Sequence, residues 1–466
     1  IKGTLMTSEI SDSTNTQTTE AQSSLRPPET QGAPVQEGGK ISDKRLFIAV
    51  VAIGIATGLA TFIMKEAIKW IGKLASLGMH IDRGNWLFLV LPVVGIMLAM
   101  IFQRYVVKSD LSHGTAMIKR DLQDGEYRLA PNLMYTNILG CSVTIGFGGS
   151  AGAEGPSAYT GAAIASNFSR WLHIDRRWLR LLIGVGAGAG IAGIFKSPVG
   201  GVLFTLEVLC LELNTLSVIA LVAACLLSSC TALALGGFAF DMKFVDYMPF
   251  NPSNFFWMIL LGLVCGLYSI YYNTSKARTD RILAGITNPW LRALTAGLSL
   301  SVAIYFFPSL FGEGYGIVDK VINCRPSEML EYSPFYTGLS SNSLLMAVVA
   351  GVLILKGIMV GATINGGGVA GDFAPTLFAG CLVGLLFGMA MNNWFGFTLP
   401  VENYALLGMA GVMSGTIKAP LMAIFITAEM SNSYQFLFGF LIVAAVSYGV
   451  MFLWERYGMK KPAKNS

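Results

Sequence analysis

A single acidic residue, Glu154, lies in a long stretch of the sequence that otherwise carries no charge. An ionised carboxylate at membrane depth costs at least about 2.5 kcal/mol, so such a residue is a candidate functional group. It stands in the sequence GAEGP, residues 152–156, after small residues and before an apolar continuation. Glycine before it and proline just after it predict a broken helix that begins here. Because a helix start presents unpaired N–H groups and partial positive charge, we expect Glu154 to compete with a small anion for one place.

The surrounding composition predicts an all-α polytopic membrane protein. Of the 466 residues, 53% are hydrophobic and only 13% are charged, with a mean hydropathy of +0.59, whereas soluble domains carry about 25% charged residues. Shorter, glycine-interrupted apolar pieces separate the longer runs, which is typical of folds with half-helices near the midplane. Apolar runs long enough to cross a bilayer occupy 46–64, 86–102, 216–235, 255–272, 344–360 and 436–453, and the interrupted pieces occupy 140–170, 181–209, 361–390 and 404–430.

Two blocks recur in opposite halves of the chain. Residues 186–207 match residues 408–429 at an offset of 222 and share two Gly, a Lys, a Pro, a Thr and a Glu. A nearby offset of 219 aligns GAEGP (152–156) with GDFAP (371–375), and glycines precede both. Paired repeats in membrane proteins bind substrate where the repeats meet, through half-helix ends. The sequence therefore predicts two facing helix starts, aimed at one central anion.

These motifs resemble the CLC family of chloride channels and proton/chloride exchangers. Residues 152–156 match its Gly-Lys/Arg-Glu-Gly-Pro motif, with Ala153 in the basic position, and residues 371–375 match its Gly-x-Phe-x-Pro motif. The resemblance covers roughly residues 45–455 and implies two inverted-topology repeats. It also implies a multi-pass protein of the cell membrane, a homodimer with one pore per subunit, and chloride and protons as the transported ions.

The resemblance assigns roles to individual residues. Glu154 resembles the gating glutamate, which fills the outer anion site and leaves when it is protonated. Backbone N–H groups around Gly155, Asp372 and Phe373 would hold the anion, and the ring of Phe373 would add an edge. Neutral N–H donors bind chloride moderately, so that it can still leave. The helix-start motifs are completed by Gly152, Pro156, Gly371 and Pro375.

The third anion-binding motif of the family, Gly-Ser-Gly-x-Pro, is poorly kept. Ser112 or His113 is the expected side-chain donor, followed by Gly114. Gly114 favours His113 as the aligned residue, whereas hydroxyl chemistry favours Ser112. An imidazole could donate an N–H and carry a proton, or it could only cap a short helix. Both residues remain candidates.

Two departures leave proton coupling open. The inner proton-transferring glutamate of some exchangers would follow Glu207, but Val208 stands there. The family's tyrosine after the last span has no counterpart before the chain ends at Ser466. Glu207 itself is expected to be a structural support or part of a proton pathway. Proton-coupled exchange is the first hypothesis, and a passive chloride channel is the alternative.

Other charged residues near the repeated motifs have simpler expected roles. Lys196 and Lys418 each precede a proline by two residues and are expected to face water or to satisfy helix-end carbonyls. Asp372, beside the second helix start, could cap it through the helix dipole, although it also places negative charge beside an anion path. Glu429 is expected to resemble Glu207 as a buried support.

Other function classes fit less well. A serine nucleophile needs a base, and His113 is the only histidine outside the polar connectors; an enzyme is therefore not expected, nor is a cofactor or a metal site. A cation-coupled carrier with broken helices is the more distant alternative. The expected organisation is a polar tail (1–42), two repeats (43–240 and 241–458) and a short tail (459–466) without a cytoplasmic regulatory domain. Lys40, Lys44 and Arg45 favour a cytoplasmic N-terminus.

Overall fold

The computed structural model describes residues 43–77, 85–108, 111, 114–125, 127–211, 214–237, 255–335 and 341–458. This part of the chain is helical and contains no β-strand, and eight of its helices are long and apolar enough to cross a membrane. The prediction of an all-α polytopic membrane protein is confirmed. The first-half helices are α2 (Asp43–Ala75), α3 (Leu87–Ile101), η1 (Phe102–Val107), α4 (Gly114–Asp124), α5 (Leu133–Gly146), α6 (Glu154–Trp171), α7 (Arg176–Phe195), α8 (Pro198–Leu203), η2 (Phe204–Val208) and α9 (Thr215–Leu235).

The second half continues the same pattern of long and short helices. Its elements are α10 (Phe255–Ala284), α11 (Pro289–Phe306), η4 (Pro308–Leu310), α12 (Tyr315–Ile322), η5 (Pro326–Leu330), α13 (Asn342–Asn365), α14 (Phe373–Phe395), α15 (Val401–Ile417), α16 (Pro420–Met430), η6 (Tyr434–Phe436), α17 (Leu437–Leu453) and η7 (Trp454–Gly458). The expected repeat boundary at 240/241 and both tails lie outside the described residues, so those limits stay predictions.

All six expected spans correspond to helices, but two are longer than hydropathy indicated. Helix α2 continues past residue 64 to Ala75, and α10 continues past residue 272 to Ala284. Their last turns contain Lys, Glu, Arg and Ala, which lower the hydropathy but favour helix formation. The segments expected only as interrupted pieces overlap the spans α7 and α14, and α11 was not expected at all.

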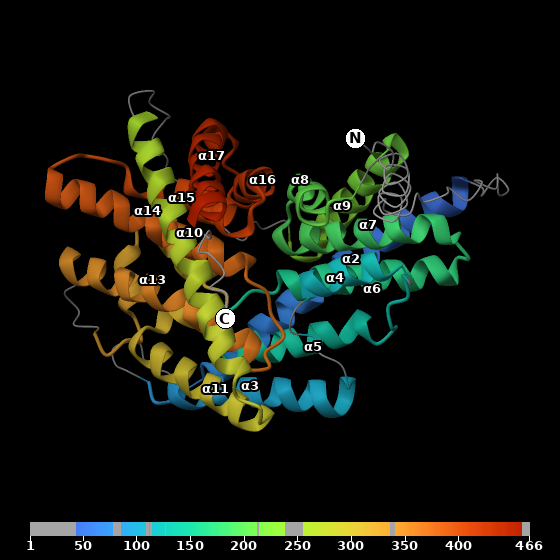
Figure 1. Ribbon diagram of the computed structural model, residues 1–466, viewed down its shortest axis with the longest axis horizontal. Helices are drawn as coiled ribbons and strands as arrows, with labels where there is room; N and C mark the ends of the chain where they lie inside the picture. Colours follow the sequence, from blue (N-terminus) through green and yellow to red (C-terminus); the bar gives the residue numbers. More distant parts are fainter. Residues whose placement is uncertain are drawn as a thin grey trace, which may run out of the picture. The chain divides into compact units, whose positions relative to one another are not determined.

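The two halves of the chain form two groups of helices (Figure 1). Helices α4–α9 gather together, and α10 and α13–α17 form the other group. Helix α3 is an exception, because it packs against α11 of the second half. The groups also meet where α8 contacts α16 and where α6 contacts α14. The duplicated blocks of sequence therefore lie at the contact between the two halves.

Glycine pairs bring equivalent helices together in both halves. A Cβ on Gly161 of α6 would clash with the carbonyl oxygen of Gly186 of α7, and the reverse substitution would clash as well. Gly380 of α14 and Gly408 of α15 make the same mutual approach. The second pair lies 219 and 222 residues after the first, the offsets of the sequence repeat. Small residues at such crossings allow backbones to approach closely. Both repeats therefore pack two helices together through a pair of facing glycines.

We expect Gly161→Ala to lower the free energy of unfolding by about 1–3 kcal/mol, because the added methyl must push α7 away. Gly449→Ala in α17 is the matched control, since a Cβ there meets nothing within 4 Å. It should be neutral, or stabilising by about 0.5–1 kcal/mol through helix propensity. Reversible unfolding in mixed detergent measures both variants, and equal effects of the two substitutions would contradict this account of the helix pair.

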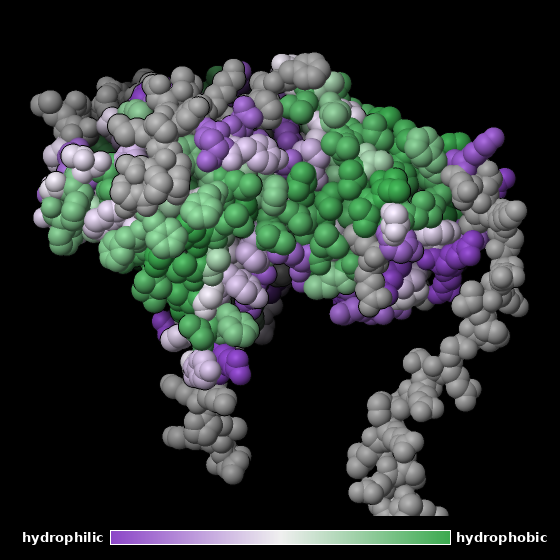
Figure 2. Space-filling model, turned by 90° about the horizontal axis from the view of Figure 1, so that it is seen from above, coloured by the Kyte–Doolittle hydropathy of each residue, from purple (hydrophilic) through white to green (hydrophobic). Residues whose placement is uncertain are grey.

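The molecular surface agrees with a membrane setting. Figure 2 shows apolar side chains gathered in a broad zone, with hydrophilic side chains toward its margins. Large apolar side chains are well exposed on several spanning helices, among them Phe47, Ile219, Leu267 and Ile354. Exposed apolar surface of this extent marks contact with lipid or with protein partners. The chain is a multi-pass membrane protein.

Candidate anion site between the two repeats

The two helix starts predicted from the motifs meet in the structure. Helix α6 begins at Glu154, α14 begins at Phe373, and the residues just before them pair as an isolated antiparallel bridge. The N–H of Gly152 donates to Gly371 O over 2.8 Å, and the N–H of Gly371 donates to Gly152 O over 2.6 Å. The side chain before each helix makes no capping hydrogen bond. Both starts therefore present first-turn N–H groups near one point.

The carboxylate of Glu154 occupies this meeting point. The side chain is fully buried, and a Cβ on Gly152 would collide with its Oε2 atom while lying 2.8 Å from the Cβ of Ala374. Oε1 accepts a hydrogen bond from the Tyr315 hydroxyl at 2.9 Å. Oε2 makes no hydrogen bond of ordinary geometry with the described residues. The N–H groups of Glu154 and Ala374 favour the negative charge, so elements of both repeats act on this carboxylate.

Three glycines allow the chain segments to converge here. A Cβ on Gly371 would lie 2.8 Å from the backbone nitrogen of Gly155, and one on Gly114 would lie 2.5 Å from the carbonyl oxygen of Gly155. The structure therefore brings the start of α4 to the same place as the two predicted helix starts. Ser112 and His113 lie outside the described residues, and the choice between them remains a prediction.

Helix α4 is held in this position by a polar contact with α6. The hydroxyl of Tyr159 donates to Asp121 Oδ2 at 3.2 Å. Burial raises the pKa of the Asp121 carboxyl above its usual range, and the hydrogen bond from Tyr159 offsets part of that rise. The contact keeps Gly114 at the head of α4 beside the start of α6.

Asp372 does not cap α14, which corrects one expectation. Its carboxylate pairs with the ammonium group of Lys276 from α10, and no side chain caps that helix start. The cation compensates the negative charge of Asp372 beside the predicted anion site. An anion-binding role of the Asp372 backbone N–H stays a prediction.

A buried lysine beside the site was missed by the sequence analysis. Lys356 of α13 is fully buried, donates to Ser150 Oγ at 2.9 Å, and lies with its Nζ 4.7 Å from the centroid of the Phe378 ring. Glu154 and Glu313 are its electrostatic partners. The signal was present, because a charged residue inside the expected span 344–360 is a functional candidate by default.

A second missed group comes from the segment before α12. Glu313 Oε1 accepts a hydrogen bond from the backbone N–H of Ala153 at 3.2 Å, and Tyr315 contacts Glu154 as described above. Both residues line a cavity of about 440 Å³ that also reaches Lys65 and Asp319. The sequence GEGY at 312–315 carries an acidic residue between glycines, but no local pattern links it to Glu154 so far along the chain.

Glu207 and Glu429 each cap the start of a helix in the opposite repeat. The Glu207 carboxylate accepts from the N–H groups of Leu421 (3.2 Å) and Met422 (2.8 Å) at the start of α16. Glu429 accepts from Val199 (3.3 Å) and Gly200 (3.0 Å) at the start of α8. Carboxylates at helix N-termini are stabilising. This geometry is that of a structural support, and a part in proton transfer remains untested.

The lysines at the ends of the repeated helices also have equivalent positions. Lys196 and Lys418 both adopt left-handed backbone conformations, with φ of 55° and 64°, and end α7 and α15. Their backbone N–H groups donate to carbonyls of the preceding turn, those of Ala192 and Ser414. The side chain of Lys418 pairs with Glu455. The backbone N–H groups of both lysines thus satisfy helix-end carbonyls.

The ring of Phe373 packs against the first repeat. It makes an edge contact with Phe204 of η2, with centroids 5.9 Å apart and an interplanar angle of 68°. Val208, at the end of the same π-helical turn, is buried. Phe373 therefore lies between the two repeats, beside the bridge, where its expected contact with an anion stays a prediction.

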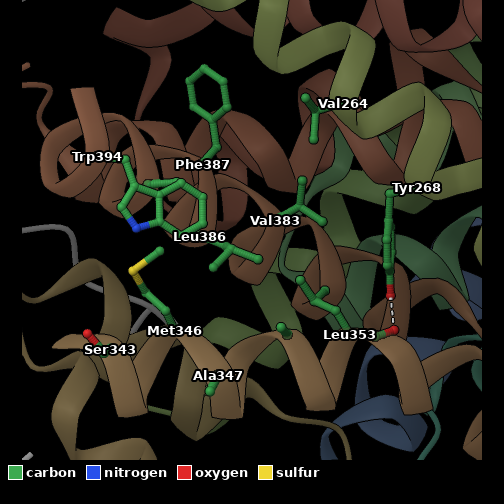
Figure 3. Close-up of a pocket in the computed structure, with 12 residues that line it drawn as sticks. Val264, Tyr268, Ser343, Met346, Ala347, Leu353, Val383, Leu386, Phe387 and Trp394 are labelled. Atoms are coloured by element: carbon green, nitrogen blue, oxygen red, sulfur yellow. Dashed lines mark hydrogen bonds between the residues drawn. The ribbon is translucent and has the colours of Figure 1, made fainter. Parts of the chain in front are cut away.

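A larger cavity lies elsewhere and has a different character. It measures about 590 Å³ between α10, α13 and α14 and is lined by apolar side chains such as Val264, Leu386 and Trp394 (Figure 3). The hydroxyl of Tyr268 at its wall is already donated to Leu353 O at 2.9 Å. An apolar lining offers little to a small anion, so this cavity is distinct from the site at the helix starts.

In this multi-pass membrane protein, two helix starts meet around a buried carboxylate. That arrangement is typical of the class of membrane proteins that bind small ions between paired repeats. A family model described as voltage gated chloride channel matches residues 94–451. The chain therefore belongs to this CLC family, as its motifs indicated.

Curated relatives and solved structures agree with this membership. The chain is 26% identical over 422 residues to the voltage-gated ClC-type chloride channel ClcB of Salmonella typhimurium, covering 87% of this chain and 95% of the relative. It is 27% identical to a putative chloride channel protein ClcB-like of Ralstonia nicotianae, with 85% and 91% covered. In fold it resembles a slow cyanobacterial Cl⁻/H⁺ antiporter (TM-score 0.72, 21% identity, 90% and 99% covered) and a CLC-type fluoride/proton antiporter (0.71, 23%, 89% and 97%).

Proposed function

We propose that the protein carries chloride across the cell membrane in exchange for protons, with Glu154 as the gate. In its ionised form the carboxylate fills the anion site between the helix starts. Protonation removes its charge, the side chain leaves, and chloride takes the vacated place. The working unit is a homodimer with one pore per subunit, its N-terminus in the cytoplasm.

The observation that carries the proposal is the position of the Glu154 carboxylate. It is fully buried against Gly152 and close to Ala374, where the first turns of α6 and α14 present N–H groups. A carboxylate and a chloride ion both need N–H donors and positive potential, so both suit this place. Conduction requires a site that binds moderately, and neutral N–H groups meet that need.

Transport by purified protein in liposomes tests the proposal. Under an imposed chloride gradient, with a potassium ionophore to compensate the charge that is moved, an exchanger drives protons uphill, and the external pH changes until an uncoupler is added. An unchanged external pH together with chloride flux would establish the uncoupled channel, which Val208 favours. Flux that requires sodium and persists without halide would instead establish a cation-coupled carrier.

A further inference from the structure

The segment that leads into α12 and includes its first residue is held between the two repeats. We call residues 311–315 the latch segment. In the first repeat, Gly148 has φ +101°, and a Cβ there would lie 2.6 Å from the ring of Phe311. In the second repeat, a Cβ on Gly314, which has φ +91°, would lie 2.5 Å from the ring of Phe378. The latch segment is therefore fitted closely against the loop before α6 and against the first turns of α14.

Two side chains of the latch segment contact the Glu154 region directly. The Tyr315 hydroxyl donates to Glu154 Oε1 at 2.9 Å, and Glu313 Oε1 accepts from the N–H of Ala153 at 3.2 Å. The first contact holds the carboxylate itself. The second fastens the latch segment to the backbone of the residue just before it. The cavity of about 440 Å³ lies against the same two side chains.

Other titratable groups act on Glu154 from the elements around it. Among these described groups, the Tyr315 hydroxyl donates a hydrogen bond to the carboxylate. Lys65 also lies with its Nζ 5.5 Å from the centroid of the Tyr315 ring. The titratable side chains in question are Lys65 of α2, Cys141 of α5, Tyr272 of α10, Glu313 of the latch segment, Tyr315 of α12 and Lys356 of α13.

We propose that Tyr315 and Glu313 are positioning residues that set the pH at which Glu154 leaves its buried place. Tyr315 stabilises the ionised, inward carboxylate by donating a hydrogen bond to it, which is stronger than one between neutral groups. Glu313 holds Tyr315 in reach by accepting the Ala153 N–H. This inference rests on the proposed function, because it concerns the release of the same gate.

Tyr315→Phe removes only the hydroxyl that contacts Glu154. The ionised, inward carboxylate loses stabilisation, so the gate opens at lower proton concentration. We expect the midpoint of chloride flux against pH to rise by about one unit, a tenfold change in the gating equilibrium. Tyr271→Phe is the matched control, since that hydroxyl donates to Ile354 O at 2.7 Å on an exposed surface. It should leave the midpoint unchanged.

Glu313 is tested by comparing two substitutions. Glu313→Gln keeps an oxygen that can accept the Ala153 N–H, and its midpoint should stay within a few tenths of a unit of wild type. Glu313→Leu loses the acceptor, and its midpoint should rise as in Tyr315→Phe. If Gln behaves as Leu does, the charge of Glu313 matters rather than the anchor, and its assigned role is wrong.

A double substitution separates this inference from the proposed function. In a Glu154→Ala background the gate is absent, so Tyr315→Phe should no longer alter the pH dependence. If Glu154→Ala has the same chloride flux and the same pH dependence as wild type, the proposed function fails. If flux depends on Glu154 but Tyr315→Phe behaves as Tyr271→Phe does, or shifts flux equally without Glu154, the latch is overturned while the gate stands.

Discussion

Glu154→Gln is expected to abolish chloride-driven proton movement while chloride still crosses the membrane. Glutamine keeps the size of the side chain but carries no charge and cannot take up a proton, so it imitates the protonated gate permanently. Proton transport should fall to the level of protein-free liposomes, and chloride flux should lose its dependence on pH. Both are measured in one vesicle preparation with a pH electrode and a chloride electrode.

Glu207→Gln is the matched control for this substitution. Its carboxylate caps the start of α16, away from the bridge between the helix starts, and glutamine retains one acceptor oxygen. We expect proton coupling to persist in Glu207→Gln, at most with reduced stability. Uphill proton movement by Glu154→Gln would contradict the role proposed for Glu154.

Lys356→Met is expected to weaken chloride binding by at least about tenfold, which corresponds to about 1.4 kcal/mol. Lys356 is fully buried in a spanning helix, where its partners are one hydroxyl, one aromatic ring and the nearby carboxylates. When Glu154 leaves, chloride replaces it as the negative charge near this lysine. Methionine has a similar length and no charge, so the anion loses that attraction. Isothermal titration calorimetry in detergent measures the affinity.

Lys418→Met controls for the general loss of a lysine. Lys418 lies at the end of α15, its ammonium group pairs with Glu455, and its side chain is 47% exposed. Chloride affinity should therefore stay within about twofold of wild type. Unfolding in mixed detergent verifies that both variants are folded. Equal affinity of Lys356→Met and wild type would show that the lysine only fills space.

The duplicated motifs allowed the centre of the fold to be predicted. GAEGP and GDFAP place proline two residues into α6 and α14, where a missing N–H costs nothing, and the helices do start at Glu154 and Phe373. The meeting of these starts followed from the repeat, because paired repeats converge at midplane. Both the local preference for a helix start and the symmetry of the two repeats could therefore be recognised from the sequence.

Contacts between distant segments could not be predicted in the same way. Tyr315 lies 161 residues after Glu154, and only tertiary packing brings the two together. Helix α11 was missed because Arg292 and several small or hydroxylated residues interrupt its apolar sequence. Lys356 was different: it was visible inside an expected span, and its charge alone was sufficient reason to consider it.

The proposed transport requires an anion site between the starts of α6 and α14, and crystals soaked in bromide test that site directly. In Glu154→Gln we expect an anomalous peak where the carboxylate of Glu154 now lies, beside Gly152 and close to Ala374. In wild type at high pH the ionised carboxylate should keep bromide out of that place. Bromide found only in the apolar cavity near Trp394, or nowhere near the bridge between Gly152 and Gly371, would contradict the account.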